Sequence, residues 1–163
     1  MDAATRKAKL EEIKTNQLNQ AMTGIPLRYK GTTRTEIVWR IPLDYLIYNK
    51  YNGRIGSDVL SYEKQNGELN AELDSDREII ETFLYESKVD RNKTTMESLL
   101  KIGQQRYGIV TSDGIIVDGN RRAMLLNRLF HKYEEYGYSY AEVEKSQYFL
   151  AIILPDDAEE KDI

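Results

Sequence analysis

The apolar residues of this chain recur at two spacings, one typical of amphipathic helices and the other of half-buried strands. The helical spacing predicts helices over residues 3–22, 76–86, 96–103 and 120–135. Alternation and short β-branched runs predict strands over residues 35–41, 107–111, 115–117 and 147–154. The expected core positions of the two middle helices are Ile79, Ile80, Phe83, Leu84, Met96, Leu99, Leu100 and Ile102. The first helix has its apolar residues only loosely on one face, so we expect it to be peripheral or to bind a partner.

The segments between these elements are rich in turn residues. The glycines and the proline at 24–31 indicate a linker. Residues 42–56 predict a short turn of helix and then a polar loop, and residues 57–73, which have no firm period, predict a mobile excursion on the surface. The sequence at 155–157, a proline and two aspartates, is typical of the start of a further helix.

Residues 113–129 combine a strand, a glycine turn and a basic helix. The β-branched run at 115–117 stops just before Gly119, which adopts backbone angles that a side chain would forbid, and the helix begins directly afterwards. The first amides of a helix have no intrahelical partner and lie at the positive end of its dipole, so an anion is favoured there. Because Arg121 and Arg122 add two full charges, the segment predicts a phosphate-binding site.

A purely structural interpretation of the same turn stays open. Asp118 or Asn120 is a suitable cap for an amphipathic helix whose arginines are simply solvated. Asp118 also has the chemistry to hold Mg²⁺ beside a triphosphate, directly or through water. His131 is the only histidine, which excludes a histidine-based triad and a centre with several histidine ligands.

The composition narrows the class of protein. The 163 residues suit one domain with its own core. The absence of cysteine excludes disulfides, cysteine-based zinc sites and a thiol nucleophile, and it favours an intracellular setting. A net charge of −4 argues against a surface that is basic throughout. No apolar run approaches the roughly 18 residues of a membrane helix, and the start is not a signal peptide, so we expect a cytoplasmic protein without a membrane partner.

Three short motifs occur in order along the chain. They are IPLDYLIYNKYNGR at 41–54, SLLKIGQQRYGIVTSDG at 98–114 and DGNRRAMLLNRL at 118–129. Together they resemble the first box, the Ser-Ile-x-x-x-Gly helix with its strand, and the Gly-Glu-Arg-Arg box of the ParB/sulfiredoxin superfamily, in particular its ParB-like N-terminal domains. The last motif also resembles the Asp-Gly-x-x-Arg motif in the N-terminal domains of phage-defence and modification-dependent restriction proteins.

The resemblance covers about residues 36–163, with an insertion over 57–90. It implies an α+β fold in which helices pack on a small mixed sheet. We therefore expect residues 1–34 to form an N-terminal helical extension with its linker, and residues 35–163 to form the ParB/sulfiredoxin-like nucleotide-binding domain.

The resemblance also implies a ligand, a nucleoside triphosphate such as CTP or ATP, together with Mg²⁺. The phosphate-binding residues that it implies are Gly119, Asn120, Arg121 and Arg122, with Asn52 and Arg54 from the first motif. Arg122 matches the arginine shared by the ParB-type and sulfiredoxin-type boxes, so we expect it to contribute most, with Arg54 as its partner. Asp118 is the candidate metal ligand.

Two departures from the family pattern limit the chemistry. Asn120 stands where sulfiredoxins have their cysteine, which excludes reduction of a sulfinic acid. The Glu-Asn-x-x-Arg box of ParB proteins that hydrolyse CTP does not follow the last strand. We therefore expect either a fragment of a longer protein or a variant that binds nucleotide without hydrolysing it.

Three functions fit these observations. The preferred one is a nucleotide-binding switch in a DNA-related system, either partitioning or phage defence, that meets DNA directly or through domains outside this chain and acts with a partner protein or a second copy. The second is an enzyme, a nucleotide hydrolase or nuclease subunit of a restriction or defence system. The third is a non-catalytic protein-interaction module. The first is preferred because a general base and a set of metal ligands are not evident.

Overall fold

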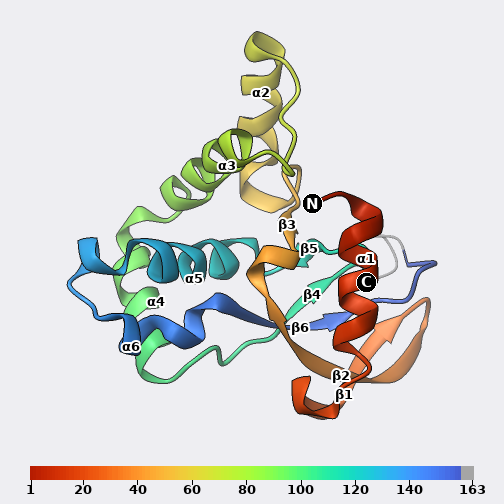
Figure 1. Cartoon of the computed structure of the whole chain (residues 1–163). Helices are drawn as coiled ribbons and strands as arrows, with labels where there is room; N and C mark the ends of the chain where they lie inside the picture. Colours follow the sequence, from red (N-terminus) through yellow and green to blue (C-terminus); the bar gives the residue numbers. More distant parts are fainter. Residues whose placement is uncertain (159–163) are drawn as a thin grey trace.

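The structure is a computed structural model that describes residues 1–158. In this part of the chain, six strands form one mixed sheet (Figure 1). The strands are β1 (Gln20–Tyr29), β2 (Thr32–Pro42), β3 (Ile47–Tyr48), β4 (Gly108–Val110), β5 (Ile115–Asp118) and β6 (Tyr148–Ile153). Their order in the sheet is β1-β2-β6-β4-β5-β3. The pairs β4–β6 and β3–β5 are parallel, and the other neighbours are antiparallel. With the helices below, this is an α+β fold, as expected.

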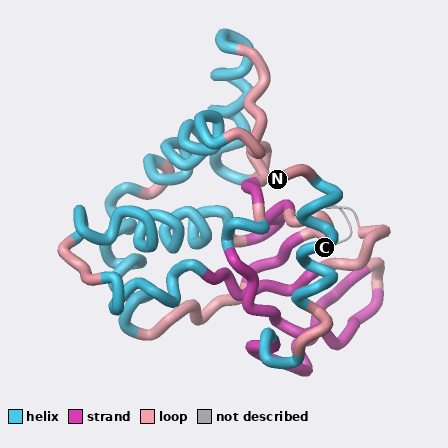
Figure 2. The backbone as a smooth tube through the Cα atoms, viewed as in Figure 1, coloured by secondary structure: helices cyan, strands magenta, loops and turns pink. Residues whose placement is uncertain are grey.

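Helices pack on and beside this sheet. The α-helices are α1 (Ala3–Ile13), α2 (Gly56–Asn66), α3 (Asp74–Glu86), α4 (Val89–Lys101), α5 (Asn120–Lys132) and α6 (Tyr140–Val143). Short 3₁₀ turns occur at Gln17–Asn19, Leu43–Tyr45, Gly53–Ile55, Tyr133–Tyr136 and Glu144–Gln147. Figures 1 and 2 show α1 lying across the strands and α3, α4 and α5 gathered to one side of them, while α2 rises away from the rest as an arm. None of these helices has the length and apolar character that crossing a membrane would need.

Helix α5 is the centre of the core because it contacts both α3 and α4. Five of its apolar side chains are fully or almost fully buried: Ala123, Met124, Leu125, Leu126 and Leu129. They join Ile80, Met96, Ile116 and Phe149 in one hydrophobic cluster. Each large apolar side chain in that cluster contributes roughly 1.5–3 kcal/mol by leaving water. The helix that carries the predicted site is therefore held rigidly.

The N-terminal third differs most from the sequence prediction. The predicted helix over 3–22 ends at Ile13, and the predicted linker forms strand β1 instead. β1 is an edge strand whose one neighbour in the sheet is β2, so turn residues are tolerated there. Pro26 has no amide hydrogen to donate, and at an edge no second strand needs one. A register irregularity between Met22 and Ile25 accommodates Gly24, whose φ is +71°.

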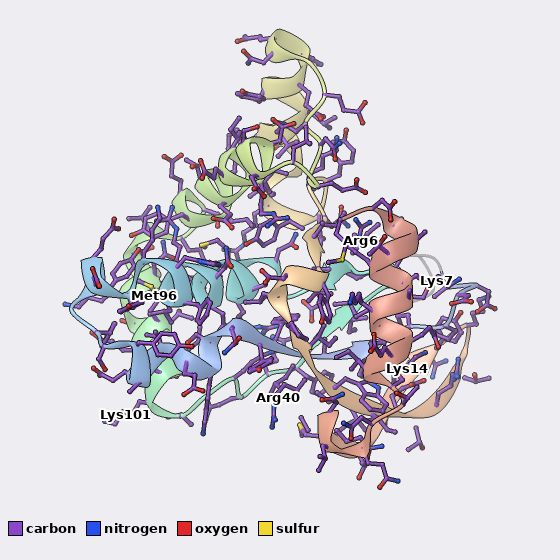
Figure 3. All side chains as sticks on the ribbon, in the orientation of Figure 1. Arg6, Lys7, Lys14, Arg40, Met96 and Lys101 are labelled. Atoms are coloured by element: carbon purple, nitrogen blue, oxygen red, sulfur yellow. The ribbon has the colours of Figure 1, made fainter. Side chains whose placement is uncertain are left out.

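Helix α1 is joined firmly to the sheet. Leu10 is fully buried in the main hydrophobic cluster. Arg6, labelled in Figure 3, has an exposed fraction of 2% and donates from Nε to the carbonyl oxygen of Asp113 at 2.7 Å. It also forms a 3.0 Å ion pair with Glu72. The helix lies at the surface, with only Arg6 and Leu10 buried, as a peripheral helix was expected to, and these two side chains attach it to the sheet.

The segment 57–73, predicted to be a mobile excursion, contains α2 and buried side chains. Val59 is fully buried, and the ring of Tyr62 meets Phe83 edge to face at a centroid distance of 6.0 Å. The helix was missed because its apolar residues are few and their partner lies on α3. Helix α4 likewise begins at Val89, several residues before the prediction, and Ile102, expected in the core, is 63% exposed.

The remaining predictions agree with the structure more closely. The four predicted strands correspond to β2, β4, β5 and β6, and the helices predicted at 76–86 and 120–135 correspond to α3 and to α5 with its 3₁₀ extension. The helix expected from Pro155 begins as a turn in which the amide of Ala158 donates to the carbonyl of Pro155 at 3.1 Å. Its continuation lies outside the described residues.

Candidate phosphate-binding site

Segments from three strands meet at one edge of the sheet. β3 and β5 are parallel, so the chain leaves both strands, after Tyr48 and after Asp118, at the same end. β4 is antiparallel to β5, so the chain enters β4 at that end. The approach is close: a Cβ atom built on Gly108 would lie 2.6 Å from the carbonyl oxygen of Asp118. Residues before β4 therefore join the residues of the first and last motifs.

Gly119 forms the turn into α5, as predicted. It is the N-cap residue, with a φ of +106°. A Cβ atom there would lie 2.7 Å from the Phe149 ring and 3.1 Å from Nη2 of Arg122, so a side chain would collide as well as strain the backbone. No side chain caps the helix, so the alternative in which Asp118 or Asn120 is the cap is wrong. The helix starts with the amide of Ala123, which donates to the Gly119 carbonyl at 2.9 Å, and leaves the preceding amides for other acceptors.

Asn120 has a structural contact that the sequence did not indicate. Its side-chain amide donates to the carbonyl of Asn49 at 2.8 Å and accepts from the amide of Asn49 at 3.3 Å. The residue is 7% exposed. Its side chain therefore binds the loop after β3, and only its backbone amide is available to bind an anion.

Asn52 is committed in the same way. Its side-chain nitrogen donates to the carbonyl of Val117, on strand β5. The two asparagines thus fasten the loop after β3 to the turn after β5 from both sides. This brings the first and last motifs together, as the resemblance implies, and sets the position of Arg54 two residues further on.

Arg121 lies in a crowded positive environment. Its Nη2 donates to Oδ1 of Asn92 at 2.8 Å, and Asn92, only 1% exposed, in turn donates to the carbonyl of Tyr85. Burial, and then the positive charges of Arg54 and Arg91, hold the pKa of Arg121 below its ordinary value. Arg54 was expected to partner Arg122, whereas its charge acts on Arg121.

Arg122 lies against the Gly119 turn. Its Nη2 is 3.8 Å from Oδ2 of Asp118, a loose ion pair in which the carboxylate is half exposed. Burial lowers the pKa of Arg122; Asp118 opposes this shift, and the charge of Arg106 adds to it. Within residues 1–158, the buried Nε atoms of Arg121 and Arg122 have no hydrogen-bond partner.

The charges of three other arginines therefore act on Arg121 and Arg122 at the start of α5, and we call this group of five the arginine edge. It comprises Arg54, Arg91, Arg106, Arg121 and Arg122. Arg54, Arg121 and Arg122 were expected here from the sequence. Arg106 directly precedes the predicted strand at 107–111. The predicted hairpin of that strand with 115–117 could have placed Arg106 near the start of the helix that follows. Arg91 lies outside the helix that was predicted, so no local signal placed it.

Asp118 is the metal ligand predicted from the sequence. Its carboxylate faces Arg122, and no group of three or more histidine, cysteine, aspartate or glutamate side chains suited to a metal occurs in the described part of the chain. A lone carboxylate is a normal protein contribution to Mg²⁺ that is bound chiefly through substrate phosphates. The residues present therefore fit a phosphate-borne Mg²⁺ better than a metal site built by the protein alone.

A cavity of about 490 Å³ lies beside the Asn49 loop. Its lining residues are Ile47, Tyr48, Asn49, Lys50, Tyr51, Glu68, Leu69, Asn70, Ala71 and Ile115. It shares Asn49 with the contacts described above, but it includes none of the predicted phosphate ligands. The arginine edge is thus a separate part of the surface from this cavity.

Comparisons with known proteins add no relative. No protein-family model, curated protein or solved structure matches the chain.

Proposed function

We propose that this protein binds a nucleoside triphosphate at the arginine edge and serves as a nucleotide-dependent switch in a DNA-related system. The observation that carries the proposal is the set of arginine charges that act on Arg121 and Arg122 at the uncapped start of α5. Like charges that act on one another repel, and a polyanion removes that repulsion. A triphosphate matches the site because it supplies several negative oxygens to the free amides and to the guanidinium groups at once.

Arg121 and Arg122 have different tasks in this proposal. Arg122 lies at the Gly119 turn, beside the free amides, so it meets a phosphate group there. Arg121 is oriented by Asn92 and shares its surroundings with Arg54 and Arg91, so it extends the positive region away from the turn. Mg²⁺ would arrive with the phosphates, and Asp118 would hold it directly or through water. When bound, that ion supplies further neutralisation of phosphate charge.

Binding is favoured over catalysis by the state of the nearby carboxylates. Asp118 is paired with Arg122, and Asp90 is the carboxylate whose charge reaches Arg121. Hydrolysis needs a group that activates or positions water, and a cradle that binds ground state and transition state equally accelerates nothing. We therefore expect slow turnover or none from this chain.

The switch follows from the connection between Arg54 and helix α2. Arg54 lies in the 3₁₀ turn Gly53–Ile55, and α2 begins at the next residue, Gly56. A ligand that draws Arg54 toward the phosphates changes the direction in which α2 leaves the body, and α2 is the arm that extends furthest in Figure 1. The DNA-related setting, partitioning or defence, rests on the motif resemblance, as does a partner that is DNA, another protein or a second copy.

One observation supports the alternative that the protein is a non-catalytic protein-interaction module. Asn120 and Asn52 show that the turn has a structural task in holding two loops together. A module of that kind has no reason to bind nucleotide. The two proposals therefore separate on a single property, the affinity for triphosphate.

The test is a thermal-shift series with CTP, ATP, GTP and UTP in the presence of Mg²⁺. Inorganic tripolyphosphate tests for binding of phosphate alone, and the nucleosides test for binding of base alone. We expect at least one nucleotide to raise the melting temperature more than tripolyphosphate does. If no nucleotide raises it at millimolar concentration, the interaction module replaces the switch. Release of phosphate at an ordinary enzymatic rate would show that the site is catalytic.

A further inference from the structure

A second and larger cavity lies away from the arginine edge. Its volume is about 790 Å³, within the range of about 300–1,000 Å³ that is usual for small-molecule sites. It is formed by the start of β1, the end of β2, the end of α4, the middle of α5, the turn after α6 and the start of β6. None of the five arginines of the arginine edge lines it.

The lining of this cavity is apolar inside and positive at the rim. Leu99 and Leu126 are buried, and Leu100 and Leu150 are half buried, so they form an apolar floor. Three exposed cations surround it from three elements: Arg40 on β2, Lys101 at the end of α4 and Lys145 in the turn before β6. Arg40 and Lys101 both lie along the lower side of the molecule in Figure 3.

The charges at the rim are not balanced by the protein. Arg40, Lys101 and Lys145 form no ion pair with any residue between Met1 and Ala158. Glu142 is the lining carboxylate, and its Oε1 already accepts from the amide of Ser139 at 3.0 Å in a helix cap. An anion in the cavity therefore meets three cations and one carboxylate that is already engaged.

A serine side chain that opens to the cavity is the second, independent indication of a ligand. Ser146 lines the cavity, is 5% exposed, and forms no hydrogen bond through its side chain within the described residues. Its oxygen is not among the enclosed unpaired atoms, so it is accessible from the cavity and free to pair with a polar atom of a ligand. Because a hydroxyl donates as well as accepts, it suits the oxygen of a carboxylate.

We propose that this cavity binds a small organic anion with an apolar body, of the class of a medium-chain carboxylate. The apolar chain lies on the leucine floor, and the carboxylate lies between the rim cations and the hydroxyl of Ser146. The cavity is not part of the proposed nucleotide site, so the inference stands or falls independently of it. Gln104 lines the cavity and also donates to the carbonyl of Arg106, so a ligand here lies one loop away from the arginine edge.

Titration of the whole chain with octanoate, octanol and octyltrimethylammonium tests the proposal, with amide NMR spectra to locate binding. The three probes share the apolar chain and differ in charge. We expect octanoate to bind saturably and to shift the amides of Leu100, Ile102, Gln104 and Ser146. Octanol should bind about tenfold more weakly, and the cation more weakly still.

Charge reversal at the rim supplies the matched comparison. Lys101→Glu or Lys145→Glu should weaken octanoate binding about fivefold or more, because an attraction becomes a repulsion. Lys64→Glu is the control, since Lys64 lies in the last turn of α2 as Lys101 lies in the last turn of α4, and it should leave the affinity unchanged. Ser146→Ala should weaken binding about threefold without lowering the melting temperature, because no protein hydrogen bond is lost.

Three results would overturn the proposal. They are octanol binding as tightly as octanoate, amide shifts that centre on Arg121 and Arg122 instead of the cavity, and an equal effect of Lys64→Glu and Lys101→Glu. The third would show that overall charge, and not this site, sets the affinity.

Discussion

The side chain of Asn120 holds the backbone of Asn49 with two hydrogen bonds, one to its carbonyl at 2.8 Å and one from its amide at 3.3 Å. The two residues are 71 positions apart in the sequence. Each begins a segment that follows one of two parallel strands, so this contact fixes the distance between the first motif and the start of α5. The arrangement of Arg54 and Arg121 depends on it.

Replacing Asn120 should therefore lower stability. Asn120→Ala removes two part-buried hydrogen bonds to the backbone of Asn49, which costs about 1–3 kcal/mol in the free energy of unfolding. Asn120→Asp should cost at least as much, because a carboxylate oxygen then faces the carbonyl of Asn49. Urea denaturation measures both. Asn66→Ala, at an exposed position at the end of α2, is the control and should cost less than about 0.5 kcal/mol. Equal losses at the two sites would show that the contact does not hold the loop.

Gly119 should tolerate no side chain. Gly119→Ala combines a left-handed backbone with a Cβ atom 2.7 Å from the Phe149 ring, so we expect a loss of about 2 kcal/mol or more. Gly137→Ala is the matched control, because Gly137 also has a positive φ, +79°, but has open space around its Cβ position. It should lose about 1 kcal/mol, from the backbone alone. Thermal unfolding of the two variants, run side by side, would contradict the packing argument if the losses were the same.

The two adjacent arginines should contribute unequally to nucleotide binding. Arg122→Ala removes a charged hydrogen bond at the turn, worth about 1.5–3 kcal/mol, so the affinity should fall about tenfold or more. Arg121→Ala should have a smaller effect, because its guanidinium group already donates to Asn92. Lys132→Ala, in the last turn of α5, is the control. Calorimetry on the three variants decides the matter, and equal, negligible effects at both arginines would remove them from the site.

An ion pair away from the site should control acid stability. Lys50 lies 2.8 Å from Glu63. Burial alone would raise the pKa of Glu63, but hydrogen bonds from Lys50, Leu69 and Tyr51 outweigh it and hold that pKa below its ordinary value of 4.5. A carboxyl whose pKa is depressed in the folded state stabilises the protein above its unfolded pKa and loses that contribution as the pH falls through the folded pKa.

The stability of the wild type should therefore decline below about pH 4.5 more steeply than that of Glu63→Gln, which has no proton to take up there. Glu68→Gln is the control, because Glu68 is 81% exposed in its ion pair with Lys50 and should contribute little. Denaturation midpoints across the acid range measure the slopes. Parallel slopes for the wild type and Glu63→Gln would contradict the prediction.

The parts of the fold that could be predicted carry their information locally. The β-branched run before Gly119 and the regular apolar spacing after it identify β5 and α5 without knowledge of the rest of the chain. Strand β1 could not be identified in this way, because Gly24 and Pro26 are turn signals, and what makes them a strand is pairing with β2 at a sheet edge. Local sequence does not specify such pairing.

The site shows the same limit. Arg54, Arg121 and Arg122 were expected at the site from their motifs. Arg106 lies in the second motif but was not expected at the site, and it comes there through the pairing of β4, as Arg91 does through the packing of α4. The hydrogen bonds of Asn52 and Asn120 could not be predicted either. An asparagine that binds phosphate and an asparagine that holds a loop cannot be told apart from the sequence. Their partners, Val117 and Asn49, are defined by the fold.

The most direct test of the nucleotide proposal is calorimetric titration of the wild-type chain and of an Arg121→Ala, Arg122→Ala double variant with the four ribonucleoside triphosphates and Mg²⁺. We predict saturable heat from at least one nucleotide with the wild type and its loss in the double variant, with the fold of the variant checked by its melting curve. Absence of heat from all four nucleotides at millimolar concentration, or unchanged binding by a folded double variant, would contradict the assignment of the arginine edge as a triphosphate site.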